Sequence, residues 1–216
     1  MKPRVGVVGV GAMGMGMARA LLERGFAVGV RDLVSAREDE AIAAGAERLG
    51  NVDVLVSVVV DAAQTRDVAG EHAPRAPVFM MCSTIAPSDT EAIAQELSKL
   101  GVEMLDAPIS GGPARARAGT LSVMAAGSEA AFARCAQVLD AVSAKCFRIG
   151  STPGDGSRMK VVNNMLAAAN LAAGAEALAI AQAAGLDLQR VCDVVNASSG
   201  ASWIFADRVG RALTRD

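Results

Sequence analysis

The feature that most constrains the fold of this 216-residue chain is a glycine-rich segment, Gly9-Val-Gly11-Ala-Met-Gly14, placed between two regular patterns. Residues 4–10 form an apolar run ending in glycine, typical of a strand buried on both faces, and residues 12–24 have helical spacing. Glycines there allow a tight turn and a close approach of the backbone to a pyrophosphate, and the helix N-terminus offers free N–H groups. The residues predicted to contact the phosphates are Gly9, Gly11, Ala12, Met13 and Gly14.

An acidic residue, Asp32, follows the second predicted strand (residues 26–30) at the distance that a dinucleotide-binding fingerprint requires. Its carboxylate can accept hydrogen bonds from a ribose diol and would repel a 2′-phosphate, which favours NAD over NADP. Arg31 indicates the opposite, because an arginine at this place can hold a 2′-phosphate. Alone, Asp32 would be interpreted as a solvated carboxylate at a strand end; its spacing from the glycines makes NAD binding the preferred interpretation.

Strand and helix patterns alternate through the first 156 residues. Further strands are predicted at residues 52–60, 78–82, 102–106, 122–126 and 146–149, and helices at 88–100 and 127–142. This alternation predicts an α/β fold in residues 1–156, a Rossmann-type doubly wound parallel sheet that binds NAD. Residues 157–216 form an all-helical segment, with helices expected at 158–185, 187–196 and 202–213.

The composition is that of a globular protein, with 52% hydrophobic residues, 20% charged residues and a net charge of −2. This balance gives no reason to expect nucleic acid or an anionic membrane as partner. The uncharged run 161–175 is too short to span a bilayer, and the N-terminus has no signal-peptide pattern. With four scattered cysteines and one histidine, His72, in a polar loop, no metal site is expected and a reducing cytoplasm is the favoured location.

A second motif, DAPISGGPARARAGTL, covers residues 106–121 and follows the end of a predicted strand. Its Ser110, Gly111 and Gly112 (the SGG turn) could direct backbone N–H groups at a carboxylate. The alternative is an ordinary turn, and three residues alone do not decide between the two.

Four segments, taken in order, resemble the β-hydroxyacid dehydrogenase family, which includes 3-hydroxyisobutyrate dehydrogenase. They are VGVVGVGAMGMGMA at 5–18, MCSTIAP at 81–87, DAPISGGPARARAGTL at 106–121 and GDGSRMKVVNN at 154–164. Within the family, VSVVVDAAQT at 56–65 and SSGASWIFADRV at 198–209 most resemble the L-threonate dehydrogenase branch. The resemblance implies NAD-dependent oxidation of a small hydroxy acid.

The resemblance also implies roles for individual residues. The glycine-rich turn (residues 9–14), Asp32, Val60 and Thr84 would bind the cofactor. The SGG turn would anchor the substrate, Lys160 would be the catalytic residue, and Asn163 and Asn164 would orient the substrate.

Lys160 suits the chemistry, because oxidation of an alcohol by NAD leaves a proton that the protein must accept. A lysine acts as a base near neutral pH only when its pKa is lowered. The apolar neighbours Met159, Val161 and Val162 are consistent with partial burial, and the dipole at a helix N-terminus also disfavours the ammonium form. From position alone, a snorkelling lysine at a helix end is the simpler interpretation.

The chain departs from the family pattern at its C-terminal side, where relatives continue through further helices that carry another lysine. A shortened family member that retains only dinucleotide binding is therefore an alternative to an active dehydrogenase, and an imine reductase is a third. The helix at 158–185 would leave apolar surface uncovered, so we expect a homo-oligomer, either a dimer or a tetramer.

Overall fold

The computed structural model describes residues 1–214, with side chains described through residue 208, and it divides into two compact units. The first, the sheet unit, is Met1–Lys160; the second, the helical unit, begins at Val161. The strands are β1 (Val5–Val8), β2 (Val28–Arg31), β3 (Glu47–Arg48), β4 (Val54–Ser57), β5 (Val78–Met81), β6 (Glu103–Asp106), β7 (Ile109–Ser110), β8 (Leu121–Ala126) and β9 (Ser143–Gly150). The helices of the sheet unit are α1 (Ala12–Glu23), α2 (Ser35–Ala43), α3 (Ala62–His72), the 3-10 turn η1 (Ala73–Arg75), α4 (Pro87–Lys99), α5 (Gly112–Ala118) and α6 (Glu129–Val142).

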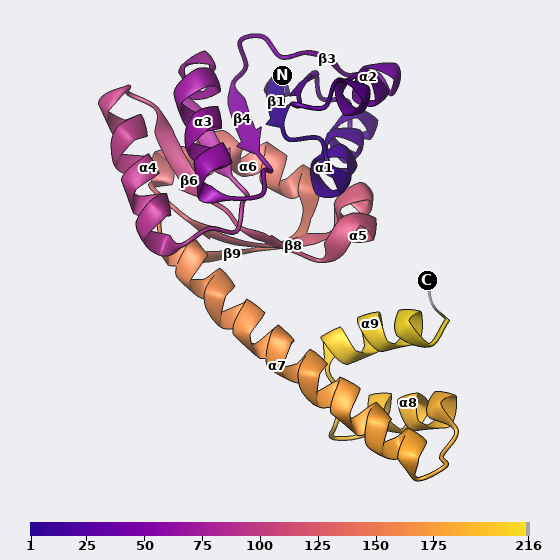
Figure 1. Ribbon diagram of the computed structural model, residues 1–216. Helices are drawn as coiled ribbons and strands as arrows, with labels where there is room; N and C mark the ends of the chain where they lie inside the picture. Colours follow the sequence, from indigo (N-terminus) through magenta and orange to yellow (C-terminus); the bar gives the residue numbers. More distant parts are fainter. Residues whose placement is uncertain (215–216) are drawn as a thin grey trace. The chain divides into compact units, whose positions relative to one another are not determined.

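The sheet has the strand order β3-β2-β1-β4-β5-β6-β8-β7, with β9 paired to β8 (Figure 1). From β3 to β6 all neighbours are parallel, and Val5 of β1 pairs with Val28 on one side and Val54 on the other. The loops that follow β1, β4, β5 and β6 therefore meet at one edge of the sheet. Strands β2 and β3 are added on one side of β1, and β4, β5 and β6 on the other. The strand order therefore switches between β1 and β4, and ligands bind at this switch point in open sheets of this kind.

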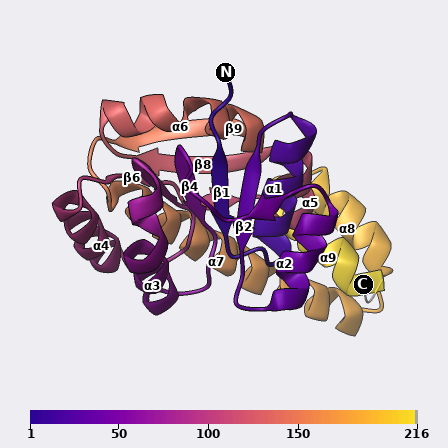
Figure 2. The ribbon, with the colours of Figure 1, turned by 90° about the horizontal axis from the view of Figure 1, so that it is seen from above.

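Helices cover both faces of the sheet and form two separate apolar cores. One core packs α1, α5 and α6 against the sheet, with Met17, Leu21 and Phe132 among its members. The other packs α3 and α4 against the opposite face, through Val68, Ile93 and Leu97. Figure 2 shows α3 and α4 grouped on one side. Burial on both faces explains why the central strands read as continuous apolar runs.

One contact between helices joins the helix that follows the SGG turn to the helix that follows the glycine-rich turn. Helix α5, which follows the SGG turn, packs against α1 at Gly16. A Cβ atom at Gly16 would lie 2.9 Å from the backbone N of Arg117 and 3.0 Å from Cβ of Ala116. The two backbones can therefore approach this closely only because residue 16 is glycine.

The helical unit contains the greater part of α7 (Asp155–Ala183), together with α8 (Leu188–Asn196) and α9 (Trp203–Thr214). Cys192 and Phe205 form its small core with Leu178 and Val195. Within residues 1–214, α7 is the one helix long and apolar enough to cross a membrane by length and composition. The charge-free run alone was expected to be too short for this, but the helix extends to 29 residues.

The predicted α/β class and the helical segment are confirmed, and three differences from the sequence-based expectations are informative. β8 runs antiparallel to β6 and β7, which the apolar pattern did not indicate. Helices α2, α3 and α5 lie in stretches for which no helix had been predicted. His72 is consequently not in a polar loop: it ends α3 and is 7% exposed, and burial lowers its pKa.

Candidate active site

The glycine-rich turn has space on one side and close backbone contacts on the other. A Cβ atom at Gly14 would lie 1.9 Å from the carbonyl oxygen of Gly9, and one at Gly9 would lie 2.4 Å from the carbonyl oxygen of Val58. A Cβ atom at Gly11 would meet no atom of the described residues within 4 Å. Gly11 is also the N-cap of α1, and the first N–H groups of a helix have no acceptor within the helix itself. This arrangement fits a bound pyrophosphate, as predicted for a dinucleotide.

Asp32 lies directly beside this turn and is 8% exposed. Its Oδ2 accepts a hydrogen bond from the backbone N of Val10 at 2.8 Å, and its Oδ1 accepts one from the backbone N of Val34 at 2.8 Å. Each carboxylate oxygen keeps a second lone pair, so Asp32 can still accept hydrogen bonds from a ribose. The carboxylate thus fixes the turn to the end of β2 and remains available to a nucleotide.

Arg31, which had raised the possibility of NADP, is bound to a buried carboxylate. Its Nη1 lies 3.0 Å from Oε2 of Glu38, and Arg48 pairs with the other oxygen of Glu38 at 2.6 Å. Burial opposes ionisation of Glu38, but hydrogen bonds from Arg31 and from the backbone N of Asp32 hold its pKa below the usual value. Arg37 lies near Asp32, with its Nη1 at 3.9 Å from Oδ1 of that carboxylate.

The loops after β4 and β5 carry the other predicted cofactor residues, Val60 and Thr84. Val60 is 80% exposed although it belongs to an apolar run, and Thr84 is also exposed. The neighbouring Ser83 joins the two loops, because its Oγ accepts a hydrogen bond from the backbone N of Val59 at 3.2 Å. An exposed valine at this edge of the sheet is consistent with a surface that a nucleotide covers.

The SGG turn leaves β7 in a backbone conformation that needs glycine. Gly111 has φ of 137° and Gly112 has φ of 76°, and both values are unfavourable for other residues. Ser110 ends β7, where it pairs with Ser122 of β8. Consecutive glycines of this kind can point successive N–H groups into one concavity.

Lys160 is buried next to this turn. It is 8% exposed, and its Nζ donates a hydrogen bond to the carbonyl oxygen of Ile109, the residue directly before Ser110, at 2.7 Å. Burial lowers the pKa of Lys160, and no carboxylate among residues 1–208 forms an ion pair with it. The other lysines, Lys2, Lys99 and Lys145, are exposed. A snorkelling helix-end lysine does not describe this side chain.

The first turn of α7 is attached to the sheet by residues that the sequence did not indicate. Asp106, at the end of β6, accepts hydrogen bonds from the backbone N of Gly154 at 2.8 Å and of Ser157 at 2.9 Å. Burial raises the pKa of Asp106, and these hydrogen bonds offset the effect only in part. These hydrogen bonds hold the first turn of α7 on the sheet. The sheet unit accordingly extends to Lys160, whereas the boundary had been predicted at residue 156.

Asn163 and Asn164 follow Lys160 in α7 but belong to the helical unit. There, Nδ2 of Asn163 donates a hydrogen bond to Oδ1 of Asn164 at 3.4 Å. Their contact with substrate stays a prediction from the family resemblance.

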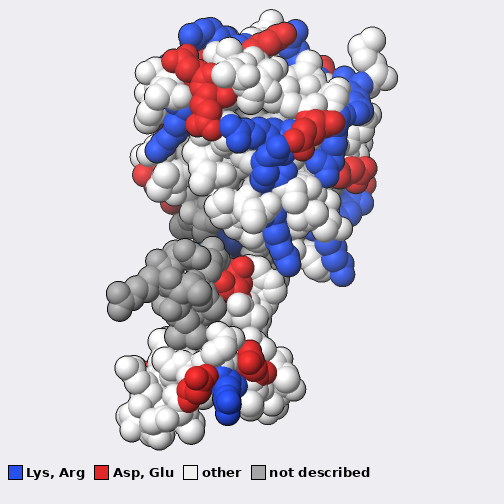
Figure 3. Space-filling model, turned by 90° about the vertical axis from the view of Figure 1, so that its right-hand side faces the viewer, with Lys and Arg blue, Asp and Glu red and all other residues white. Residues whose placement is uncertain are grey.

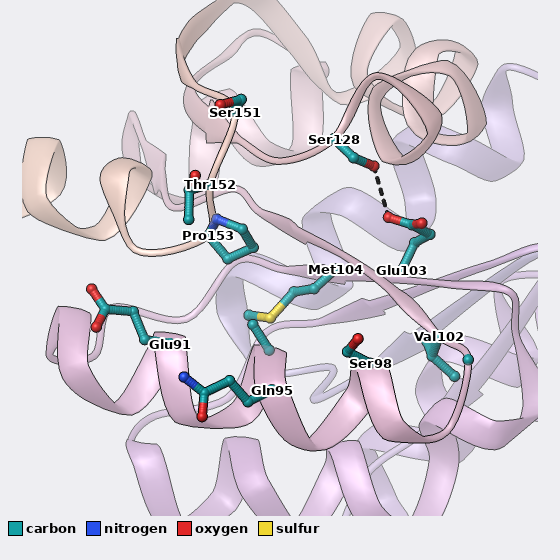
Figure 4. Close-up of a pocket in the computed structure, with 12 residues that line it drawn as sticks. Glu91, Gln95, Ser98, Val102, Glu103, Met104, Ser128, Ser151, Thr152 and Pro153 are labelled. Carbon is teal, nitrogen blue, oxygen red and sulfur yellow. Dashed lines mark hydrogen bonds between the residues drawn. The ribbon is translucent and has the colours of Figure 1, made fainter.

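A pocket of about 520 Å³ lies elsewhere in the sheet unit, between α4, the start of β6 and the segment before α7 (Figure 4). Gln95 and Ser98 of α4 face Thr152 and Pro153 across it, and Oγ of Ser128 donates a hydrogen bond to Glu103 at 2.7 Å. None of the predicted site residues lines this pocket. We therefore locate the candidate site at the strand ends, where the loops meet, and not in this pocket.

The surface charge agrees with a small-molecule site. On the face seen in Figure 3, Lys and Arg are interspersed with Asp and Glu over the sheet unit. Among the described residues there is no group of three or more His, Cys, Asp and Glu side chains placed to hold a metal ion.

Stability measurements can test the burial of Lys160 without an activity assay. Since burial lowers its pKa, the unfolded chain binds more protons than the folded chain between the folded pKa and the usual lysine value of about 10.4. Wild-type stability therefore rises with pH in that window, and Lys160→Met lacks this dependence. We expect the stability of the variant relative to wild type to be highest at neutral pH and to fall as the pH approaches 10.4. Urea unfolding of both proteins from pH 7 upward measures it; a difference that stays constant with pH would contradict the burial.

Comparisons with known proteins agree with this geometry. A family model for the NAD binding domain of 6-phosphogluconate dehydrogenase matches residues 4–150. A second model, for the NAD-binding domain of NADP-dependent 3-hydroxyisobutyrate dehydrogenase, matches residues 154–216 and so includes α7. Helix α7 is thus accounted for as part of a dehydrogenase domain, and its length is not by itself an indication of a membrane span.

Individual relatives match over nearly the whole chain. L-threonate dehydrogenase of Escherichia coli (strain K12) is 42% identical over 98% of this chain and 75% of its own length. A crystal structure of 3-hydroxyisobutyrate dehydrogenase from Salmonella typhimurium has a TM-score of 0.89 and 40% identity, and the match covers 100% of this chain and 80% of that one. A structure of Psf3 in complex with NADP⁺ and 2-OPP has a TM-score of 0.88 and 27% identity, covering 98% of this chain and 79% of that one.

The sheet, the open glycine-rich turn and these matches define the class as NAD(P)-binding oxidoreductases that act on CH–OH groups. Within that class, the chain belongs to the hydroxyacid dehydrogenase family of 3-hydroxyisobutyrate dehydrogenase and L-threonate dehydrogenase. The resemblance found in the sequence is confirmed.

Proposed function

We propose that this protein oxidises a small hydroxy acid, L-threonate or a related four-carbon sugar acid, with NAD as hydride acceptor and Lys160 as general base. One observation carries the proposal: Nζ of Lys160 lies 2.7 Å from the carbonyl oxygen of Ile109, next to the SGG turn. The residue expected to accept a proton and the turn expected to bind a carboxylate are thus neighbours. The choice of acid rests on the 42% identity to the relative named for L-threonate.

Lys160 would accept the proton of the substrate hydroxyl. In its neutral form the amine uses one N–H for Ile109 and presents its lone pair to the hydroxyl, and burial keeps that form accessible. The glycine-rich turn, Asp32, Val60 and Thr84 would hold NAD, which supplies the acceptor for the hydride.

The SGG turn would bind the substrate carboxylate through backbone N–H groups, with Ser110 adding a hydroxyl donor. Asn163 and Asn164 would hydrogen-bond the remaining hydroxyls of the acid. Binding of the carboxylate at the SGG turn would hold the carbinol carbon near Lys160, and such positioning is a large part of the rate enhancement in two-substrate reactions.

The direct test is NADH formation at alkaline pH with a panel of four-carbon sugar acids and 3-hydroxy acids. We expect turnover with at least one sugar acid, and a smaller kcat/KM for acids that lack the extra hydroxyls. NAD binding measured by calorimetry without turnover of any acid would contradict the proposal and support the alternative of a family member that only binds the dinucleotide. Turnover of cyclic imines with no acid oxidised would support an imine reductase.

Cofactor preference provides a separate prediction. We expect at least a tenfold higher kcat/KM with NAD than with NADP, because the Asp32 carboxylate would face the 2′-phosphate and like charges in close contact cost several kcal/mol. In Asp32→Asn the preference should shrink, since the repulsion is removed. Steady-state kinetics with both nucleotides measure it; equal use of NAD and NADP by the wild type would contradict the assignment of Asp32.

We also propose a cytoplasmic homo-oligomer, either a dimer or a tetramer. The apolar side chains Met165, Leu166 and Ile180 of α7 are 67%, 58% and 70% exposed in the single chain. A second copy would cover such a surface. A gel-filtration mass of one chain would contradict this proposal.

A further inference from the structure

A buried carboxylate that the proposed reaction does not use attaches α7 to the sheet. Asp106 is 0% exposed and accepts three hydrogen bonds from Gly154 and Ser157, at the start of α7. The backbone N of Gly154 and of Ser157 donate to its Oδ2, and Oγ of Ser157 donates to its Oδ1 at 2.9 Å. Asp106 therefore fixes the start of α7 both along its axis and in rotation.

Two further contacts make this attachment tight. Oγ of Ser157 also lies 2.8 Å from Oγ1 of Thr90, which joins α4 to the same network. A Cβ atom at Gly156 would lie 2.5 Å from the carbonyl oxygen of Met124 and 3.0 Å from Oδ2 of Asp106. The helix backbone thus rests directly on the sheet, with no side chain between them.

The hydrogen bond between Asp106 and Ser157 and that between Ile109 and Lys160 join the same two segments of the chain, three residues apart on each. Ser157 and Lys160 are three residues apart on α7 and therefore share a face. Asp106 and Ile109 are three residues apart on the segment that leads into the SGG turn. The Asp106–Ser157 and Ile109–Lys160 hydrogen bonds run in parallel between these two segments.

We propose that Asp106, acting through Ser157, is a positioning residue that sets the depth and register of α7 so that Nζ of Lys160 meets the SGG turn. The proposal rests on the role of Lys160 given above. A carboxylate suits this task, because it accepts all three hydrogen bonds, whereas an asparagine amide has one acceptor atom and would turn an N–H group toward a donor. A shift of the base by about 1 Å can lower a rate by about 10²-fold.

The test uses Asp106→Asn and Ser157→Ala, with Ser128→Ala as the matched control. Ser128 is also a serine at a helix start, where its Oγ accepts a hydrogen bond from the backbone N of Ala131 at 3.0 Å, but it caps α6 and its hydroxyl donates to Glu103. We expect kcat for acid oxidation to fall about 10- to 100-fold in the two test variants, with the Kd for NAD within twofold of wild type. The pH at which kcat is half-maximal should move upward, since a less buried lysine has a higher pKa. In the control variant, kcat, the Kd for NAD and the pH of half-maximal kcat should all equal those of the wild type.

A second readout does not depend on catalysis. Acetic anhydride labels neutral amines, and peptide mass spectrometry over a pH series gives a midpoint for each lysine separately. The midpoint of Lys160 should be higher in Ser157→Ala than in the wild type, because the amine is less buried in the variant. If Asp106→Asn does not fold, judged by circular dichroism, Ser157→Ala and Thr90→Val provide the test.

The outcomes separate the two proposals. An unchanged Lys160 midpoint and an unchanged kcat profile in folded Ser157→Ala would overturn the positioning role. A full rate in Lys160→Met, together with a shifted labelling midpoint in Ser157→Ala, would overturn the role of Lys160 as the base and leave the positioning of its side chain intact.

Discussion

Replacing Lys160 with methionine is expected to lower kcat for oxidation of the hydroxy acid by about 10²- to 10⁴-fold, with the Kd for NAD within about twofold of wild type. Methionine keeps most of the apolar stem that packs in this buried position, so the variant removes the amine and little else. Without the amine, the hydroxyl proton has no acceptor among the side chains described around the SGG turn. Steady-state NADH formation and calorimetric titration with NAD measure the two quantities.

Lys145→Met is the matched control for this experiment. Lys145 is exposed on β9, so its replacement removes the same charge from the chain without touching the candidate site. We expect its kcat to equal that of wild type. A kcat for Lys160→Met within threefold of wild type would contradict the assignment of the general base, whatever the behaviour of the control.

The second large effect concerns two glycines of the glycine-rich turn: replacing one should impair NAD binding, and replacing the other should impair folding. Gly11→Val should leave the fold intact, because a side chain there meets no described atom within 4 Å, but it should weaken NAD binding by roughly 100-fold or more by filling the space of the pyrophosphate. Gly14→Val should destabilise the fold by about 3 kcal/mol or more, because its Cβ would overlap the carbonyl oxygen of Gly9.

Urea unfolding and NAD titration of both variants test this pair. We expect Gly11→Val to change the NAD titration alone and Gly14→Val to change the unfolding midpoint. Normal NAD affinity in Gly11→Val would show that the pyrophosphate does not lie over this turn. A fully stable Gly14→Val would contradict the close contact between α1 and the end of β1.

The central strands were predictable because their burial on both faces makes them long apolar runs. The ends of these strands were less predictable: residues 52–60 were predicted as one strand because they are mainly apolar, but β4 spans only Val54–Ser57. Val60 continues the pattern into an exposed loop, where the apolar surface suits a ligand rather than the core. An apolar run alone does not distinguish the two.

Helix α3 shows what the apolar pattern misses. Its buried residues Thr65, Val68, Ala69 and His72 have the spacing of one helical face, and Asp61 caps its start by accepting a hydrogen bond from the backbone N of Gln64 at 2.9 Å. Two of the four buried side chains are polar, so a count of apolar residues finds no amphipathic helix. Capping signals combined with spacing would have found it.

For the candidate site, the sequence indicated the residues but not the contacts between them. Lys160 and the SGG turn were predicted from motifs, each read locally. Their contact joins residues 51 positions apart through a backbone carbonyl, and Asp106 reaches Ser157 across the same separation. A carbonyl oxygen leaves no mark on residue identity, so only the folded chain reveals which segment faces the lysine.

The close approach of α5 to α1 at Gly16 also has a consequence for substrate range. In the proposed site, the turn that holds the acid and the helix that holds the nucleotide are spaced by backbone against backbone, with no adjustable side chain between them. The length of acid that can reach from one to the other is therefore a property of the scaffold. A change in the length of acid that is accepted therefore has to come from substitutions around the SGG turn. Any side chain at residue 16 would push α5 away from α1.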